Sequence, residues 1–227
     1  MFKIVLITLM SLPLVAGFFP STVQTSIKSI DGKTIHLKKA FSANGMSGVV
    51  IHSYKNGLEA IISRITQTNS DGSATLLSKD IIHHDELPTI KTTMKVGDKV
   101  VGGYLYDNVL LLAPDADTYA RITEKYHKKW VHPDLFALYL SVIGESKPTK
   151  ENLSEFARKY QIGLIAIIRK NSILLMDAIS GKMVSKHILS NLPKKGKFPF
   201  YMRFDKIDSG WFGGESKGDY YKMVGAL

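Results

Sequence analysis

The sequence contains no cysteine among its 227 residues. This absence excludes disulfide bonds, thiol nucleophiles and thiolate metal ligands, so core packing alone must hold the fold together. No Gly-x-Ser-x-Gly nucleophile elbow occurs, and the stretch from Gly214 to Gly218 lacks the spacing of a phosphate-binding loop. No residue pattern indicates catalysis or a bound cofactor. We therefore predict that the protein is not an enzyme, has no catalytic residues and requires no cofactor.

Side chains that bind metals are dense at only one place, His83-His84-Asp85-Glu86. Neighbouring residues of a strand point to opposite faces, so the two imidazoles would not easily share one ion. Zinc sites usually need three or four converging ligands. We therefore predict a solvated loop at this position and no metal site.

Long hydrophobic runs are absent except near the N-terminus. Residues 1–17 combine Lys3, an apolar stretch over 4–15 and a pair of small residues, which is the pattern of a cleaved secretory signal. The apolar stretch is short for a membrane span, and no later stretch is long enough. We predict an exported bacterial protein of the periplasm or cell surface, with no transmembrane span in its mature chain.

Acidic residues are fewer than basic ones, with 20 Asp+Glu against 30 Lys+Arg and a formal net charge of +10. A basic protein of this kind suits an acidic partner. Nucleic acid, anionic lipid, acidic glycan or an acidic protein patch could each be that partner, and a soluble basic protein with scattered lysines is the alternative interpretation. The positive charge is dispersed, which argues against nucleic acid. The densest group, Lys194-Lys195-Gly196-Lys197, precedes several aromatic residues and could enter an acidic, aromatic-walled pocket on a protein partner. A solvated turn between two strands is the alternative interpretation.

Turn signals divide the first half of the chain at short intervals. Asp31-Gly32, Asn56-Gly57 and Asp71-Gly72 each separate two β-type runs. Asn-Gly is the strongest hairpin signal, because a type I′ turn needs positive φ at both central residues. Strands are expected over residues 23–30, 34–37, 48–51, 60–65 and 74–77. Regular short strands of this kind predict a small barrel or a sandwich.

The segment 99–140 connects this β-rich region to helices. Residues 109–112 are apolar at every position, as in a strand buried on both faces, and Pro114 ends the run. Asp115 and Asp117 then stand where carboxylates favour the start of a helix. Helices are expected to begin near Asp115, Pro133 and Thr149, the first with lysines 125, 128 and 129 in its last turn. Further strands are expected over residues 161–168, 173–176, 183–187 and 201–207, with a loop after them.

These patterns together predict an α/β (α+β) protein in two parts after the signal segment 1–17. Residues 18–113 should form a small β-barrel-like or sandwich unit. Residues 114–227 should form a three-helix plus mixed-sheet unit that ends in a basic, aromatic tail.

Two stretches of the chain are distinctive: GDKVVGGYLYDNVLLLAPDADTYARITEKYHKKWVHPDLFALYL and PTKENLSEFARKYQIGLI. They are similar to the N-terminal domain of the plasminogen-binding PgbA family of epsilon-class proteobacteria. The resemblance covers most of the chain after the signal segment and is densest over residues 88–168. It implies surface display and the capture of host plasminogen, whose kringle domains recognise lysine.

Family members named for this activity carry a longer C-terminal region that ends in lysine, whereas this sequence ends at Leu227. The resemblance therefore points to internal lysines as the binding groups. The candidate binding residues are Lys194, Lys195, Lys197, Lys217 and Lys222. The alternative hypothesis is a periplasmic or envelope scaffold or assembly factor that uses the same domain to dock another protein.

Overall fold

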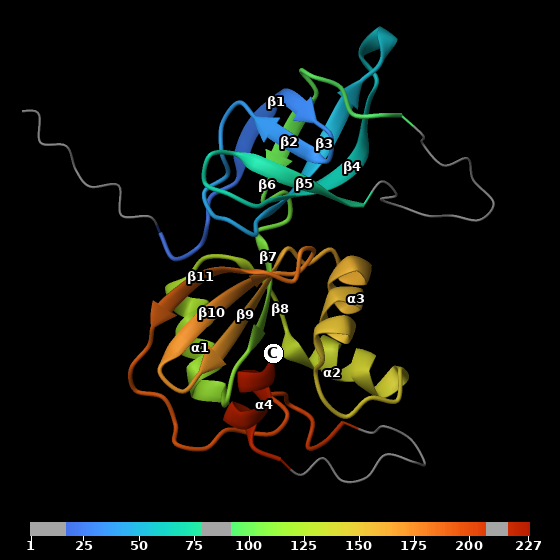
Figure 1. Ribbon diagram of the computed structural model, residues 1–227. Coiled ribbons are helices and arrows are strands. Elements are labelled where there is room, and N and C mark those ends of the chain that lie inside the picture. The colour runs from blue at the N-terminus through green and yellow to red at the C-terminus, as the bar shows by residue number, and fades with distance from the viewer. Residues whose placement is uncertain (1–16, 79–91, 208–217) are drawn as a thin grey trace, which may run out of the picture.

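The computed structural model describes residues 17–78, 92–207 and 218–227, which form a barrel and a separate sheet with helices (Figure 1). The barrel strands are β1 (Val23–Asp31), β2 (Thr34–Leu37), β3 (Ser47–Ser53), β4 (Glu59–Gln67), β5 (Ser73–Ser78) and β6 (Lys99–Gly102), with the 3₁₀ turn η1 (Lys55–Gly57) between β3 and β4. The second unit contains β7 (Asn108–Leu112), β8 (Lys129–Val131), β9 (Leu164–Arg169), β10 (Ser172–Asp177), β11 (Met183–Ile188), α1 (Ala116–Lys125), α2 (Pro133–Val142), α3 (Lys150–Tyr160) and α4 (Tyr220–Ala226).

The barrel is closed, in the strand order β1-β2-β5-β4-β3-β6, and β6 pairs back with β1. Neighbouring strands are antiparallel throughout. The β3–β4 hairpin turns at Asn56 and Gly57, where φ is 70° and 74°. Positive φ at both residues is what the Asn-Gly signal predicts. Closure pairs the edges of the sheet with each other and resolves the choice between barrel and sandwich.

The second sheet is mixed, in the order β11-β10-β9-β7-β8. Strand β7 lies between β8 and β9 and is parallel to both, whereas β10 and β11 continue the sheet with antiparallel pairs. Val109 and Leu111 join the core that extends into the barrel and receives Ile122 of α1. Leu110 and Leu112 join the core formed with α2, α3 and α4. The expected burial of this strand on both faces is confirmed.

The predicted α/β (α+β) class is confirmed, and α4 adds a short fourth helix where a loop was expected. The two sheets divide the chain between β6 and β7. The reason is that β7 finds its partners in β8 and β9, which follow it in the sequence.

Two local predictions in the second half are wrong. Helix α1 ends at Lys125, and Lys129 begins the short strand β8 instead of lying in the last helical turn. Residues 201–207 form no strand, because the Tyr201 amide donates to the Ala113 carbonyl as a single bond instead of joining a ladder. That bond holds the segment against the end of β7.

The first described residues pack directly onto the second unit. The ring of Phe18 lies 5.5 Å from that of Tyr126, and the ring of Phe19 lies 5.2 Å from Tyr126 and 6.2 Å from Trp130. Residues 1–16, which contain most of the predicted signal, lie outside the described part of the chain. No helix in the described ranges has the length and apolar character needed to cross a membrane.

A buried carboxylate joins the barrel to the sheet. Asp177, at the end of β10, is 0% exposed. Its Oδ2 accepts hydrogen bonds from the Ser47 amide, the Ser47 hydroxyl and the Tyr106 hydroxyl, each at 2.7 Å. Its Oδ1 accepts from the amides of Ile179 and Ser180 at 2.9 and 2.7 Å. Burial, together with the negative charge of Asp177, raises the pKa of Tyr106, which therefore remains a protonated donor.

We expect the substitution Tyr106→Phe to lower the free energy of unfolding by about 1.5–3 kcal/mol, because a buried hydrogen bond to a charged acceptor is lost. Tyr104→Phe is the matched control, since Tyr104 is 54% exposed. It should change stability by less than about 0.5 kcal/mol. Urea unfolding of both variants measures the difference, and equal effects would contradict the importance of the bond.

Helix α2 begins with an imidazole as its N-cap. The Nδ1 atom of His132 lies 3.2 Å from the backbone amide of Asp134 and 3.2 Å from its Oδ1. Burial lowers the pKa of His132; the Arg203 charge adds to this effect, and the Asp134 carboxylate opposes it. The rings of Tyr119 and Tyr201 lie 5.2 and 6.1 Å away. Neutral imidazole is therefore favoured in the folded state.

We predict that wild type loses stability relative to His132→Asn as the pH falls from 7.5 to 5. The unfolded chain binds a proton on this imidazole near pH 6.5, whereas the folded chain resists it until a lower pH. Asparagine keeps a capping oxygen but does not titrate in this range. Urea unfolding at both pH values measures the difference, and a constant gap between the two proteins would contradict the assignment.

Candidate functional site

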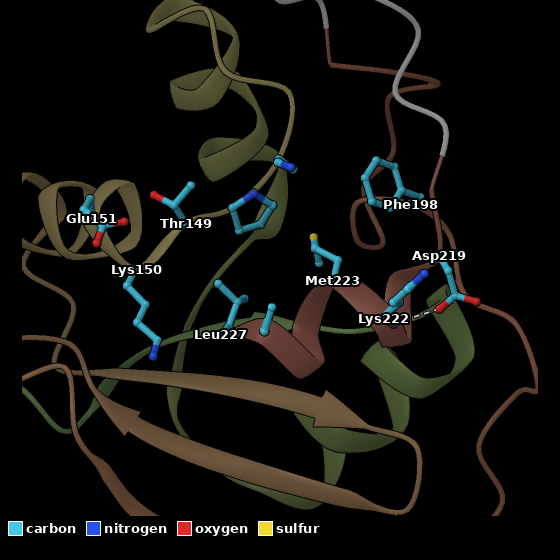
Figure 2. Close-up of a pocket in the computed structure, with 11 residues that line it drawn as sticks. Thr149, Lys150, Glu151, Phe198, Asp219, Lys222, Met223 and Leu227 are labelled. Carbon is cyan, nitrogen blue, oxygen red and sulfur yellow. Dashed lines mark hydrogen bonds between the residues drawn. The ribbon is translucent and has the colours of Figure 1, made fainter.

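A groove of about 480 Å³ lies between the start of α3 and helix α4 (Figure 2). The volume lies within the range of small-ligand and peptide pockets. The groove is lined by Lys147, Pro148, Thr149, Lys150, Glu151, Phe198, Asp219, Lys222, Met223, Ala226 and Leu227.

The groove combines an apolar lining with charged residues. Phe198 and Met223 lie on one side, and Thr149 and Glu151 of the α3 end lie on the other (Figure 2). Phe198 is half-buried, since it packs closely on Gly218: a Cβ at Gly218 would lie 2.5 Å from the Phe198 ring. The lining can therefore receive an apolar group, while charged side chains surround it.

The two acidic residues of the groove, Glu151 and Asp219, accept hydrogen bonds from backbone amides at the starts of α3 and α4. At α3, the Thr149 hydroxyl accepts from the Asn152 amide, and the Asn152 side chain accepts in return from the Thr149 amide, which is a capping box. Hydrogen bonds from its own amide and from Thr149 lower the pKa of Glu151. At α4, Asp219 accepts from the Lys222 amide at 2.8 Å. Both carboxylates thus satisfy backbone donors that a helix start leaves unpaired.

Three lysines of the groove remain exposed: Lys147, Lys150 and Lys222. Within the described ranges, no carboxylate makes an ion pair with their ammonium groups. Lys150 lies on the α3 side and Lys222 on the α4 side (Figure 2). Exposed lysine ammonium groups of this kind can enter acidic pockets on a partner.

The structure does not gather the five predicted lysines into one site. Lys194 and Lys195 are exposed in a turn. The Lys197 ammonium donates to the carbonyls of Met202 at 2.9 Å and Phe204 at 2.5 Å, so its charge is already engaged. Lys222 lines the groove, and Lys217 lies outside the described residues. Lys147 and Lys150 were missed, because their position opposite α4 depends on packing that no local pattern reveals.

Within the residues that the structure describes, no three His, Asp or Glu side chains are placed to hold a metal ion. The His83–Glu86 cluster lies outside these residues, and its interpretation as a solvated loop remains a prediction.

The family model for "Plasminogen-binding protein pgbA N-terminal" matches residues 22–227. The chain belongs to this family. Two relatives from Helicobacter pylori, strains J99 and 26695, are both named "Plasminogen-binding protein PgbA". Each is 24% identical over 169 residues, which cover 72% of this chain and 37% of the relative. No solved structure matches the chain.

The match to the family's N-terminal model includes the barrel, the mixed sheet and helix α4. The resemblance identified from the sequence is thereby confirmed. The aligned residues span 37% of each relative. The relatives' name was therefore given to proteins that are longer than the matched region.

Proposed function

We propose that this chain is an exported, non-enzymatic binding module that captures plasminogen through internal lysine side chains. The observation that carries the proposal is the match of residues 22–227 to the N-terminal model of a family named for plasminogen binding. The exposed lysines add chemical support, because an ammonium group on a short stem is what a lysine-recognising domain receives.

Two groups of lysines are candidates for this contact. Lys147, Lys150 and Lys222, which we call the groove set, surround an apolar surface that can add contact area. Lys194 and Lys195, which we call the turn set, are exposed on a turn. Lys197 is expected to contribute least, because leaving its two carbonyl acceptors would cost hydrogen bonds.

The purified chain is expected to bind immobilised plasminogen, and 6-aminohexanoate, a lysine analogue, should abolish the binding. Changing the groove set and the turn set together to glutamine should weaken binding by roughly tenfold or more, as expected for lost charge pairs at an interface. Surface plasmon resonance measures both effects, and each set changed alone assigns the main contact.

Lys28, Lys33 and Lys38 provide the control for charge, since they are exposed on the barrel. Changing these three to glutamine matches the charge change of the groove set and should alter binding less than about twofold. Binding that survives in the combined variant, or that ignores 6-aminohexanoate, would refute capture through these lysines. An absence of binding by the wild-type chain would refute the plasminogen proposal and favour the alternative, an envelope scaffold or assembly factor.

Export is supported by the sequence of residues 1–17, which has the pattern of a cleaved signal. Phe18 and Phe19, which follow that segment, pack onto Tyr126. We predict that the protein recovered from the bacterial envelope begins at Phe18. Intact-mass measurement of the recovered protein tests this, and a product that retains residues 1–17 would contradict the prediction.

A further inference from the structure

Ligands of α/β sheets usually bind outside the carboxyl ends of the parallel strands. Here the parallel strands lie in the order β9, β7, β8. At the carboxyl ends of β9 and β7, a residue of the chain itself takes the place that a ligand would occupy. The Tyr220 hydroxyl lies 2.8 Å from the carbonyl oxygens of both Leu112, the last residue of β7, and Ile168, the last but one of β9. Strand β8 ends at Val131, on the other side of β7 from β9.

Beside the end of β8, five side chains from three segments meet; we call them the Arg203 cluster. Tyr119 comes from α1, His132 and Asp134 from the start of α2, and Tyr201 and Arg203 from the segment that follows β11. Tyr119 lies 5.2 Å from His132 and 5.4 Å from Tyr201 between ring centroids. His132 and Tyr201 are 6.1 Å apart, so the three rings form a triangle.

The guanidinium group of Arg203 is fixed by a carboxylate. Nε of Arg203 donates to Oδ2 of Asp134 at 2.5 Å, and the Arg203 amide donates to Oδ1 at 2.8 Å. The side chain of Asp134 is 10% exposed, whereas that of Arg203 is 70% exposed. The anchor is therefore buried and the guanidinium is open to solvent. In the described ranges, no carbonyl or carboxylate accepts from its terminal nitrogens.

The terminal nitrogens of Arg203 are hydrogen-bond donors that cannot accept. Both oxygens of Asp134 are already used by Arg203. The hydroxyls of Tyr119 and Tyr201 have no hydrogen-bond partner among the described residues. Burial, and then the neighbouring Tyr201, raise the pKa of Tyr119, so that hydroxyl stays protonated. The exposed guanidinium offers donors only, and the two partly buried tyrosine hydroxyls can add a donor each, which favours an oxyanion as the ligand.

We infer that the Arg203 cluster binds a carboxylate group, with the terminal nitrogens of Arg203 as a two-pronged donor and the tyrosine rings against the carbon skeleton. A planar guanidinium matches a carboxylate in this way, whereas an ammonium does not. The fixed Nε means that little side-chain freedom is lost on binding. The carboxylate belongs either to a small organic acid or to an acidic peptide, and the two sources share this chemistry.

The test is a nuclear magnetic resonance titration of the ¹⁵N-labelled chain, following the Arg203 Nε–H signal. One arm adds sodium succinate, a second adds a short peptide with two adjacent glutamates, and sodium chloride at equal ionic strength is the reference. A saturable shift with a dissociation constant on the order of 1 mM is expected in at least one arm. The tighter arm identifies the source of the carboxylate.

Arg203→Lys keeps the charge but loses the fork, and it should weaken binding roughly tenfold or more. Tyr119→Phe should weaken it by a smaller factor, about twofold to fivefold. Arg121→Lys is the matched control, because Arg121 is an exposed arginine of α1 whose guanidinium donates to the Asn191 carbonyl. It should bind as wild type does.

Two results would overturn the inference: no saturable shift in either arm beyond that of sodium chloride, or binding that is unchanged in Arg203→Lys. The thermal midpoint of each variant shows whether it is folded. Because Tyr119→Phe leaves the Asp134–Arg203 pair intact, it tests the site even where Arg203→Lys is unstable. None of these measurements involves plasminogen, so the inference can fail or succeed independently of the proposed function.

Discussion

The buried carboxylate of Asp177 is the interaction on which the relation between the two units depends. It accepts five hydrogen bonds, three of them from Ser47 and Tyr106. Ser47 begins the barrel strand β3, and Tyr106 lies between β6 and β7. A buried charge of this kind is tolerated only while all its donors remain in place, since each lost donor leaves the charge less compensated. The close approach of Gly163 to Leu105 adds a steric requirement, because a Cβ at Gly163 would lie 2.3 Å from the Leu105 carbonyl. Barrel and sheet therefore form one packed body with a shared core.

That packing also explains where function can reside. In many α/β proteins the crevice at the carboxyl ends of the strands holds a substrate. Here the hydroxyl of Tyr220 lies against the carbonyls of Leu112 and Ile168, and the Lys197 amide donates to the Pro114 carbonyl. The chain thus covers the central part of the edge with its own residues. The remaining features are surface features: the lysines around the groove and the cluster around Arg203. This arrangement fits a family named for binding.

Much of the fold could be predicted because its signals are local. Alternating apolar residues and the Asn56-Gly57 turn specify barrel hairpins, and Asp115 and Thr149 cap helices through neighbouring amides. The candidate sites could not be predicted in the same way. Tyr119 and Tyr201 meet only because the segment after β11 returns to α1. Lys147 and Lys222 line one groove only because the fold brings α4 opposite the start of α3. The expected strand at 201–207 failed for the same reason, since the Tyr201 amide donates to the distant Ala113 carbonyl and the Arg203 amide to the Asp134 carboxylate.

The packing of Phe18 and Phe19 has a consequence for the proposed export, because it bears on when a leader could be removed. Both rings lie against Tyr126, and Phe19 also reaches Trp130 and has the Lys128 ammonium 5.2 Å from its centre. A peptidase needs several extended residues on each side of the bond that it cuts, and a folded body would withhold the residues on one side. Cleavage after a leader of 17 residues would therefore come before this corner docks. The two phenylalanines would then dock onto Tyr126 only after release from the proposed leader.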